Sequence, residues 1–282
     1  MSTEIYYFSD TGNSFYVARE LAKRIPEARL TPIASLLCKD AVSADVDAVG
    51  FVFPTHGMIS PIPVRRFLKK IDLGSANYLF SVVTRGGTKF LGFKKMDRIL
   101  GKQGKRLDAC FLLNMADNDP KFEVYDIPTA ERIAGIESVV QGRLDSIART
   151  ITEKKASRER DTEFVHDSNY FLERLVILGM VYAEFNGVND YFYCDEKCKG
   201  CGTCEKVCLS GKIEMADDKP LWRDDVKCYM CYACLNYCPA ESVQIKDKWF
   251  MKSYTPKNGR YPHPYATAAE IAAQKTGGRP DK

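Results

Sequence analysis

The sequence predicts an α/β protein: a five-stranded, doubly wound parallel sheet, then a helical insert and a small α+β domain. Two observations lead to this prediction. Strand-like apolar runs alternate with helical patterns in the first part of the chain, and cysteines gather near its C-terminal end. We place the boundaries at 1–118 for the sheet domain, 119–192 for the insert, 193–250 for the cysteine-containing domain and 251–282 for a C-terminal tail.

Composition narrows the class of protein. The chain has 282 residues, of which 45% are hydrophobic and 28% charged, which is typical of a soluble globular protein. No apolar run reaches the length of a membrane span, and the N-terminus lacks the pattern of a signal peptide, so we expect a cytoplasmic protein. The net charge of +4 comes from scattered basic residues rather than a dense basic stripe, which argues against a nucleic-acid partner.

The first strand leads into a loop suited to an anion. Residues 4–8 are aromatic and β-branched, and apolar residues then recur at helical spacing over 13–25, up to Pro26. Between them lies a small, hydroxyl-rich loop, whose backbone N–H groups and adjoining helix dipole favour a phosphate. A structural helix cap is the alternative. The loop consists of Ser9, Asp10, Thr11, Gly12, Asn13 and Ser14.

Two further loops follow predicted strands. Residues 47–53, 77–84 and 107–115 are expected to be buried strands, with helices near 61–71 and 88–103. Ligands of doubly wound sheets lie beyond the carboxyl ends of the strands. We therefore add the loops after the first two of these runs to the candidate site: Pro54, Thr55, His56 and Gly57, and Thr84, Arg85, Gly86 and Gly87.

Eight of the eleven cysteines form two copies of the spacing C-x2-C-x2-C-x3-C. In such a run three cysteines bind one [4Fe–4S] cluster and the fourth binds the other cluster, whereas zinc knuckles and disulfide scaffolds fit the doubled spacing poorly. The spacing predicts one cluster on Cys198, Cys201, Cys204 and Cys238, and a second on Cys228, Cys231, Cys234 and Cys208. Cys38 and Cys110 are expected to be small buried residues, and Cys194 is off-pattern.

These motifs resemble two known families. The cysteine region resembles bacterial two-cluster ferredoxins, and Ser9–Ser14 resembles the FMN phosphate loop of flavodoxins. The resemblance implies that Ser9, Thr11, Asn13 and Ser14 contact the phosphate, and that the other two loops enclose the isoalloxazine ring. His56 stands where relatives often have an aromatic residue, and its charge there would favour the anionic reduced flavin. The order of the parts is similar to flavodoxin–ferredoxin fusion proteins of anaerobic bacteria and archaea.

The remaining segments allow two interpretations. Residues 130–151 and 166–185 are helix-like, and they either brace the domains or form a lid over the flavin. Residues 213–222 are expected to form a hairpin that turns at Asp217-Asp218, and the tail segment 261–264 is expected to dock on the body.

The combination predicts an electron-transfer protein. We expect FMN and two [4Fe–4S] clusters to exchange electrons with a soluble redox protein or a small-molecule donor or acceptor. One alternative is a flavin-dependent reductase that uses the clusters as an internal wire, with Asp117, Asn118 and His56 as polar candidates near the flavin. Another is a redox sensor.

Overall fold

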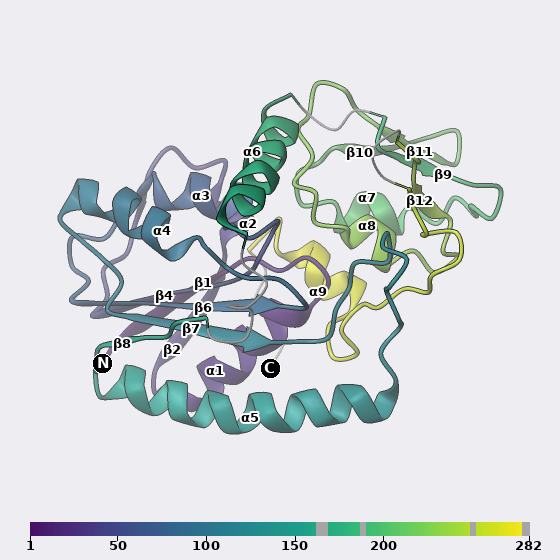
Figure 1. Cartoon of the computed structure of the whole chain (residues 1–282). Coiled ribbons are helices and arrows are strands. Elements are labelled where there is room, and N and C mark those ends of the chain that lie inside the picture. The colour runs from purple at the N-terminus through teal and green to yellow at the C-terminus, as the bar shows by residue number, and fades with distance from the viewer. Residues whose placement is uncertain (162–168, 187–189, 249–251, 278–282) are drawn as a thin grey trace.

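The computed structural model describes residues 1–161, 169–186, 190–248 and 252–277. Its largest unit is a parallel sheet with the strand order β2-β1-β4-β6-β7-β8 (Figure 1). Without the two-residue edge strand β8, this order is 2-1-3-4-5, which is the flavodoxin-like order of doubly wound sheets. The strands are β1 (Thr3–Tyr7), β2 (Ala28–Pro32), β4 (Ala48–Pro54), β6 (Tyr78–Arg85), β7 (Ala109–Asn114) and β8 (Ser157–Arg158).

Helices cover both faces of this sheet because its strands are apolar on both sides (Figure 1). Alternate residues of β1 enter opposite cores: Tyr7 packs with the helices of one face, and Tyr6 with those of the other. One face carries α1 (Asn13–Arg24) and α5 (Ala130–Thr152), and the other α2 (Ile33–Leu36), α3 (Ile62–Leu68) and α4 (Phe93–Leu100). A short 3-10 helix (Gly101–Gln103) follows α4, and β3 (Val42–Ser43) pairs with β5 (Ile71–Asp72).

The cysteine-containing domain is built from short elements. Strands β10 (Ile213–Ala216) and β11 (Lys219–Trp222) form the predicted antiparallel hairpin, and Asp217 and Asp218 at its turn have positive φ angles of 47° and 58°. Strand β9 (Phe192–Cys194) pairs with β12 (Val243–Ile245). Between the strands lie α7 (Thr203–Val207) and α8 (Ala233–Asn236), each within one cysteine run.

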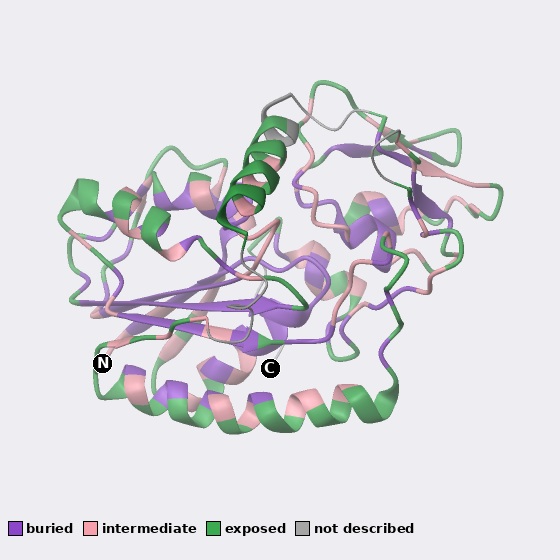
Figure 2. Ribbon diagram, in the orientation of Figure 1, coloured by how far each residue is buried: buried purple, intermediate pink, exposed green. Residues whose placement is uncertain are grey.

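Helix α6 (Tyr170–Asn186) stands between α3 and the cysteine-containing domain (Figure 1). We predicted this helix over 166–185, and residues 166–168 of that range lie outside the described part of the chain. Unlike α5, whose inner side is buried against the sheet, α6 is mostly exposed (Figure 2). Within the described residues, no helix combines the length and apolarity needed to cross a membrane.

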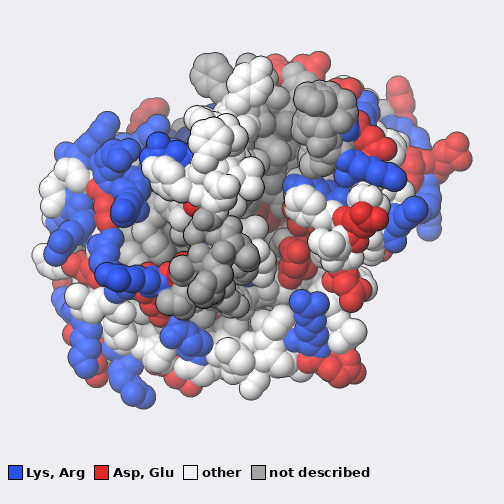
Figure 3. Space-filling view, in the orientation of Figure 1, with Lys and Arg blue, Asp and Glu red and all other residues white. Residues whose placement is uncertain are grey.

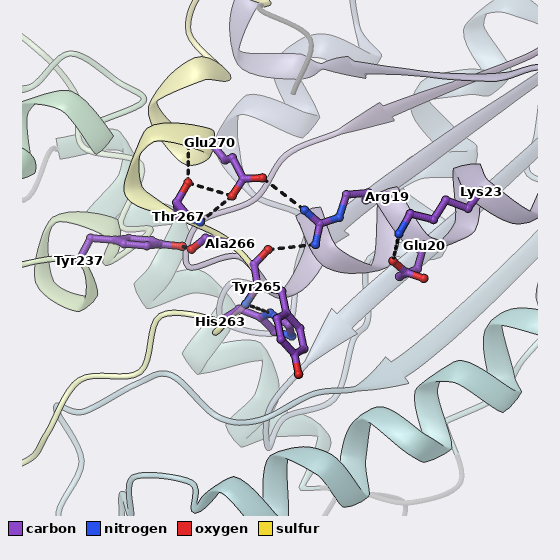
Figure 4. A network of polar contacts seen from close by, with 9 residues as sticks. All are labelled: Arg19, Glu20, Lys23, Tyr237, His263, Tyr265, Ala266, Thr267 and Glu270. Atoms are coloured by element: carbon purple, nitrogen blue, oxygen red, sulfur yellow. Dashed lines mark hydrogen bonds and ion pairs between the residues drawn. The ribbon is translucent and has the colours of Figure 1, made fainter. Parts of the chain in front are cut away.

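The tail returns to the sheet domain and ends in α9 (Ala268–Ala273). Thr267 and Glu270 form a capping box that fixes the start of this helix (Figure 4). The Tyr261–Pro264 segment docks as expected, because the His263 backbone N–H donates to the Thr11 carbonyl oxygen at 2.7 Å. The tail therefore lies directly against the phosphate loop.

Candidate functional site

The three predicted loops meet at the carboxyl edge of the sheet and enclose a cavity of about 40 Å³. We call it the phosphate-loop cavity. It also includes Asn118, which we had named only as a polar candidate near the flavin. Among the predicted residues, Gly12, His56, Gly57 and Gly87 do not line it. Those that do are Ser9, Asp10, Thr11, Asn13, Ser14, Pro54, Thr55, Thr84, Arg85 and Gly86.

The polar atoms of this cavity fit a phosphate. Helix α1 begins after Gly12 with no side-chain hydrogen bond capping its N-terminus, so its first N–H groups are left for a ligand. The Ser9 and Thr55 hydroxyl groups are buried and have no hydrogen-bond partner among the described residues. Buried polar groups are normally satisfied, so orphaned hydroxyls beside a helix N-terminus indicate an absent anionic partner.

A buried acid–imidazole pair adjoins the cavity. His56 Nε2 lies 2.5 Å from Asp10 Oδ2, and both side chains are largely buried. His56 belongs to a tight turn, in which it exchanges backbone hydrogen bonds with Ile59. The imidazole thus offers Asp10 a partner, which matters because an unpaired carboxylate would repel a phosphate in the same cavity.

The eight patterned cysteines line two separate cavities. The inner cysteine cavity is lined by Cys208, Cys228, Cys231 and Cys234, and the outer cysteine cavity by Cys198, Cys201, Cys204 and Cys238. Each cavity thus takes three cysteines from one run and the fourth from the other. Among the described residues, no three His, Cys, Asp or Glu side chains converge closely enough to hold a single metal ion.

The surroundings of the sulfur atoms suit an iron–sulfur cluster. The backbone N–H of Met230 donates to Cys228 Sγ at 3.3 Å, and that of Ser242 donates to Cys238 Sγ at 3.2 Å. Such N–H···S hydrogen bonds tune cluster potentials. Burial raises the pKa of the Cys204 and Cys228 thiols to about 11, so these thiolates need a nearby positive charge such as iron.

The other three cysteines stand apart from these cavities. Cys110 is buried in the sheet core, as expected. The expectation for Cys38 was wrong, because this residue follows α2 in an exposed turn. Cys194 lies in β9 opposite Val243 and lines neither cysteine cavity.

The inner cysteine cavity lies against the sheet domain. Tyr229 is buried in the same apolar cluster as Phe8 and Phe53, its ring centroid lies 6.2 Å from that of Phe8, and Cys231 packs against this cluster. Burial, reinforced by the negative charge of Asp10, holds the pKa of the Cys231 thiol well above its usual value. Phe8 directly precedes Ser9, which lines the phosphate-loop cavity, so the two cavities are neighbours.

A chain of hydrogen bonds joins the phosphate loop to the cysteine-containing domain. The Asn118 side chain donates to the Thr11 hydroxyl, and the Asn118 carbonyl accepts from Asn236 Nδ2 at 3.1 Å. Asn236 is buried in α8 between Cys234 and Cys238, and it also accepts from the Tyr261 backbone N–H. Asparagines at such positions carry no sequence signal that separates them from surface residues, so we did not predict Asn236.

The tail encloses the phosphate loop from the other side. Gln274 makes two hydrogen bonds with the Ser9 backbone, at 3.0 and 2.8 Å. Arg19 of α1 bonds the Tyr265 carbonyl and the Glu270 carboxylate, and Tyr237 of the second cysteine run bonds the Ala266 carbonyl (Figure 4). The tail therefore connects α1 to the segment that contains Cys238.

The cysteine-containing domain matches a known protein family. Residues 197–243 match the family described as the 4Fe-4S dicluster domain. Similar solved structures include a putative flavoprotein from Bacteroides uniformis, with 16% identity, coverage of 41% of this chain and 92% of that chain, and a TM-score of 0.34. They also include a flavodoxin from the domain Archaea, with 12% identity, coverage of 53% and 99%, and a TM-score of 0.33. No curated protein matches the sequence.

A flavodoxin variant from Pseudomonas aeruginosa is similar at 18% identity, with coverage of 53% of this chain and 97% of that chain and a TM-score of 0.36. The flavodoxin-like assignment rests on the strand order of the sheet itself. The iron–sulfur assignment rests on the family match and the doubled cysteine spacing. The chain therefore joins a flavodoxin-like sheet domain to a 4Fe-4S dicluster domain.

Proposed function

We propose that this protein is an electron-transfer iron–sulfur flavoprotein, which passes electrons between FMN and two [4Fe–4S] clusters to or from a soluble redox partner. One observation carries the proposal: Tyr229 of the inner cysteine cavity has its ring centroid 6.2 Å from that of Phe8, the residue directly before the phosphate loop. The two candidate cofactor sites are therefore adjacent. Placing them in one chain makes electron transfer intramolecular.

The sheet domain supplies the groups that would hold FMN. The N-terminus of α1 and the orphaned hydroxyls of Ser9 and Thr55 would bind the phosphate, while His56 holds the Asp10 carboxylate. Flavin exchanges one or two electrons, whereas a [4Fe–4S] cluster exchanges one at a time. The roles of His56, Gly57 and Gly87 beside the ring stay predictions.

The two cluster sites differ in exposure, which supports an order of transfer. The inner cysteine cavity packs on the sheet domain, and its Cys208 and Cys234 are buried while Cys228 and Cys231 are half-buried. In the outer cysteine cavity, Cys201 is exposed to solvent. We infer that the inner site exchanges electrons with the flavin, and that the outer site exchanges them with a partner at the Cys201 surface.

The packing around Gly57 favours a carrier over a reductase. Met180 of α6 packs over Gly57: a Cβ atom at this glycine would lie 2.6 Å from Met180 Cγ. A second substrate therefore has little access from this side.

Photoreduction of the anaerobic holoprotein tests the order of transfer. Cys201→Ser and Cys231→Ser variants are compared after iron analysis has identified the remaining cluster. In Cys201→Ser, the flavin should still exchange electrons with the inner cluster, while transfer to an external acceptor protein falls at least about tenfold. In Cys231→Ser, the outer cluster should no longer be reduced by the flavin. The opposite pattern would overturn the proposed order.

A further inference from the structure

Helix α6 is apolar on two sides, and the side chains on one of them are largely exposed. Its inner side faces the sheet-domain loops: Glu173 pairs with Lys89 at 2.6 Å, and Met180 covers Gly57. Its outer side carries a stripe with helical spacing, namely Phe171, Leu175, Leu178 and Tyr182, whose exposed fractions are 71%, 48%, 63% and 71%. Helices that are apolar all round are normally buried, so this stripe indicates a binding surface.

A basic groove adjoins this stripe. It has a volume of about 250 Å³, and each polar residue that lines it within the described chain is a lysine or an arginine. Val181 of α6 forms one wall, next to the outer stripe. In Figure 3, Lys and Arg gather over α3 and α4 beside the uncharged surface of α6. The lining residues are Ile62, Arg65, Arg66, Lys69, Lys95, Ile99, Val181 and Lys227.

The groove lies next to the inner cysteine cavity. Lys227 lines the groove and immediately precedes Cys228, which lines the inner cysteine cavity. Tyr229 lines the inner cysteine cavity and contacts Phe8 at the start of the phosphate loop. A molecule bound in the groove would therefore sit beside the inner cluster site, which lies between the flavin site and the outer cluster site on the proposed electron path.

We propose that the α6 stripe and the basic groove together form the docking surface of an acidic redox protein. This inference rests on the proposed function and adds a second partner site to it. An apolar centre beside a basic groove complements a partner whose apolar contact surface is flanked by carboxylates, and such charge complementarity accelerates association. Its position beside the inner cluster site gives that partner an electron path.

The charge distribution disfavours two other occupants. In a symmetric dimer through the α6 stripe, each copy would bring its own basic groove to the same interface, and like charges there are costly. A membrane surface would attract the cations, but these line a hollow between α3, α4 and Lys227 rather than the polar flanks of α6 itself. A protruding acidic surface fits that hollow better than a planar one.

The test measures electron exchange between the photoreduced holoprotein and an acidic [2Fe–2S] ferredoxin by anaerobic stopped-flow, at low and high salt. Arg66→Glu/Lys69→Glu reverses two charges of the groove. Lys102→Glu/Arg106→Glu makes the same change at exposed positions after α4 and serves as the control. Leu175→Asn/Leu178→Asn removes apolar contact from the stripe. Intact flavin and iron content, and unchanged reduction by dithionite, show that each variant retains its cofactors.

We expect the groove variant to lower the bimolecular rate at least about tenfold at low salt and less at high salt, while the control stays within about twofold. The stripe variant should lower the rate severalfold at both salt concentrations. Equal rates in the groove variant and the control would overturn the proposal. A wild-type dimer that the stripe variant converts to monomer would also overturn it, because the stripe would then bind a second copy of the chain. So would a groove variant that keeps the wild-type rate with the ferredoxin but no longer binds anionic vesicles. Absence of flavin or iron would instead contradict the proposed function.

Discussion

His56 Nε2 lies 2.5 Å from Asp10 Oδ2, which places an imidazole and a carboxylate side by side at the edge of the phosphate-loop cavity. The sequence suggested that His56 faces the flavin, which stays a prediction. In the structure His56 contacts Asp10 of the phosphate loop, and it lies edge-on to Phe8 at a centroid distance of 6.4 Å. His56 therefore acts through Asp10: its imidazole pairs with a buried carboxylate that would otherwise repel a phosphate.

The first prediction concerns this pair. Replacement of His56 by alanine should weaken FMN binding about tenfold, because the Asp10 carboxylate loses its partner beside the phosphate. Riboflavin, which lacks the phosphate, should bind the variant and the wild type equally. The double variant His56→Ala/Asp10→Asn should recover FMN affinity. Fluorescence titration of the flavin-free protein measures all of these affinities, and equal losses for FMN and riboflavin would contradict the explanation.

The second prediction concerns Gly12, whose φ of 105° disfavours other residues. A Cβ atom at this position would lie 2.5 Å from Ala266 Cβ and 2.7 Å from His263 Cβ, so Gly12→Ala should displace the tail. We expect a loss of about 2–4 kcal/mol in the free energy of unfolding. Gly104→Ala is the control, since Gly104 has a φ of 69° with open space around it, and should cost only about 1 kcal/mol. Thermal and denaturant unfolding compare the two, and equal losses would argue against the clash.

The third prediction tests the crossed ligand sets. Cys208→Ser should damage the cluster of the second run, and Cys238→Ser the cluster of the first, because each distal cysteine lines the other run's cavity. The double variant Cys208→Ser/Cys231→Ser should lose no more iron than Cys231→Ser alone, because both cysteines bind the same cluster. The double variant Cys238→Ser/Cys231→Ser should lose the iron of both clusters. Iron analysis and EPR spectroscopy measure this. The assignment would be contradicted if Cys208→Ser/Cys231→Ser lost the iron of both clusters and Cys238→Ser/Cys231→Ser lost the iron of only one.

The fourth prediction concerns His263, a fully buried residue that stacks on Tyr16 at 4.5 Å. Burial, together with the charge of Arg19, lowers its pKa from 6.5 to about 4. Between about pH 4 and pH 6.5, His263 binds a proton in the unfolded chain but not in the folded protein. The free energy of unfolding should therefore fall as the pH falls below about 6.5. The slope is about 1.4 kcal/mol per pH unit.

The control variant is His263→Phe, which keeps the aromatic contact with Tyr16 but cannot titrate. The difference in unfolding free energy between the wild type and this variant should shrink or reverse as the pH is lowered from about 6.5 to about 5.5. Denaturant unfolding at each pH measures this difference. A difference that stays constant over this range would show that His263 does not carry the pH dependence.

The sheet and the cysteine domain could be predicted because their signals are local. The β1–α1 unit follows from an apolar run, a glycine loop and helical spacing, and the cluster runs follow from cysteine spacing alone. The edge strand β8 could not be predicted, because Ser157 and Arg158 lie in a polar segment without the apolar pattern of a strand. Its pairing depends on β7, far away in the sequence.

The contacts of the sheet domain with the tail, α6 and the cysteine-containing domain could not be predicted from the sequence either. Gln274 and Asn236 are buried because two distant segments meet at the phosphate loop, and nothing in their own neighbourhoods indicates burial. The same holds for the packing of Met180 over Gly57, which favours the lid interpretation of α6, while the packing of α5 on the sheet favours bracing for that helix. Sequence periodicity identified both helices without indicating these different surroundings.

The central claim is that one chain holds FMN and two clusters at adjacent sites. The most direct test is an anaerobic measurement of iron, acid-labile sulfide and extracted flavin per chain. We expect about eight irons, about eight sulfides and about one FMN per chain. Eight irons without flavin, even after addition of FMN, would leave a ferredoxin on a repurposed α/β domain and contradict the proposed function.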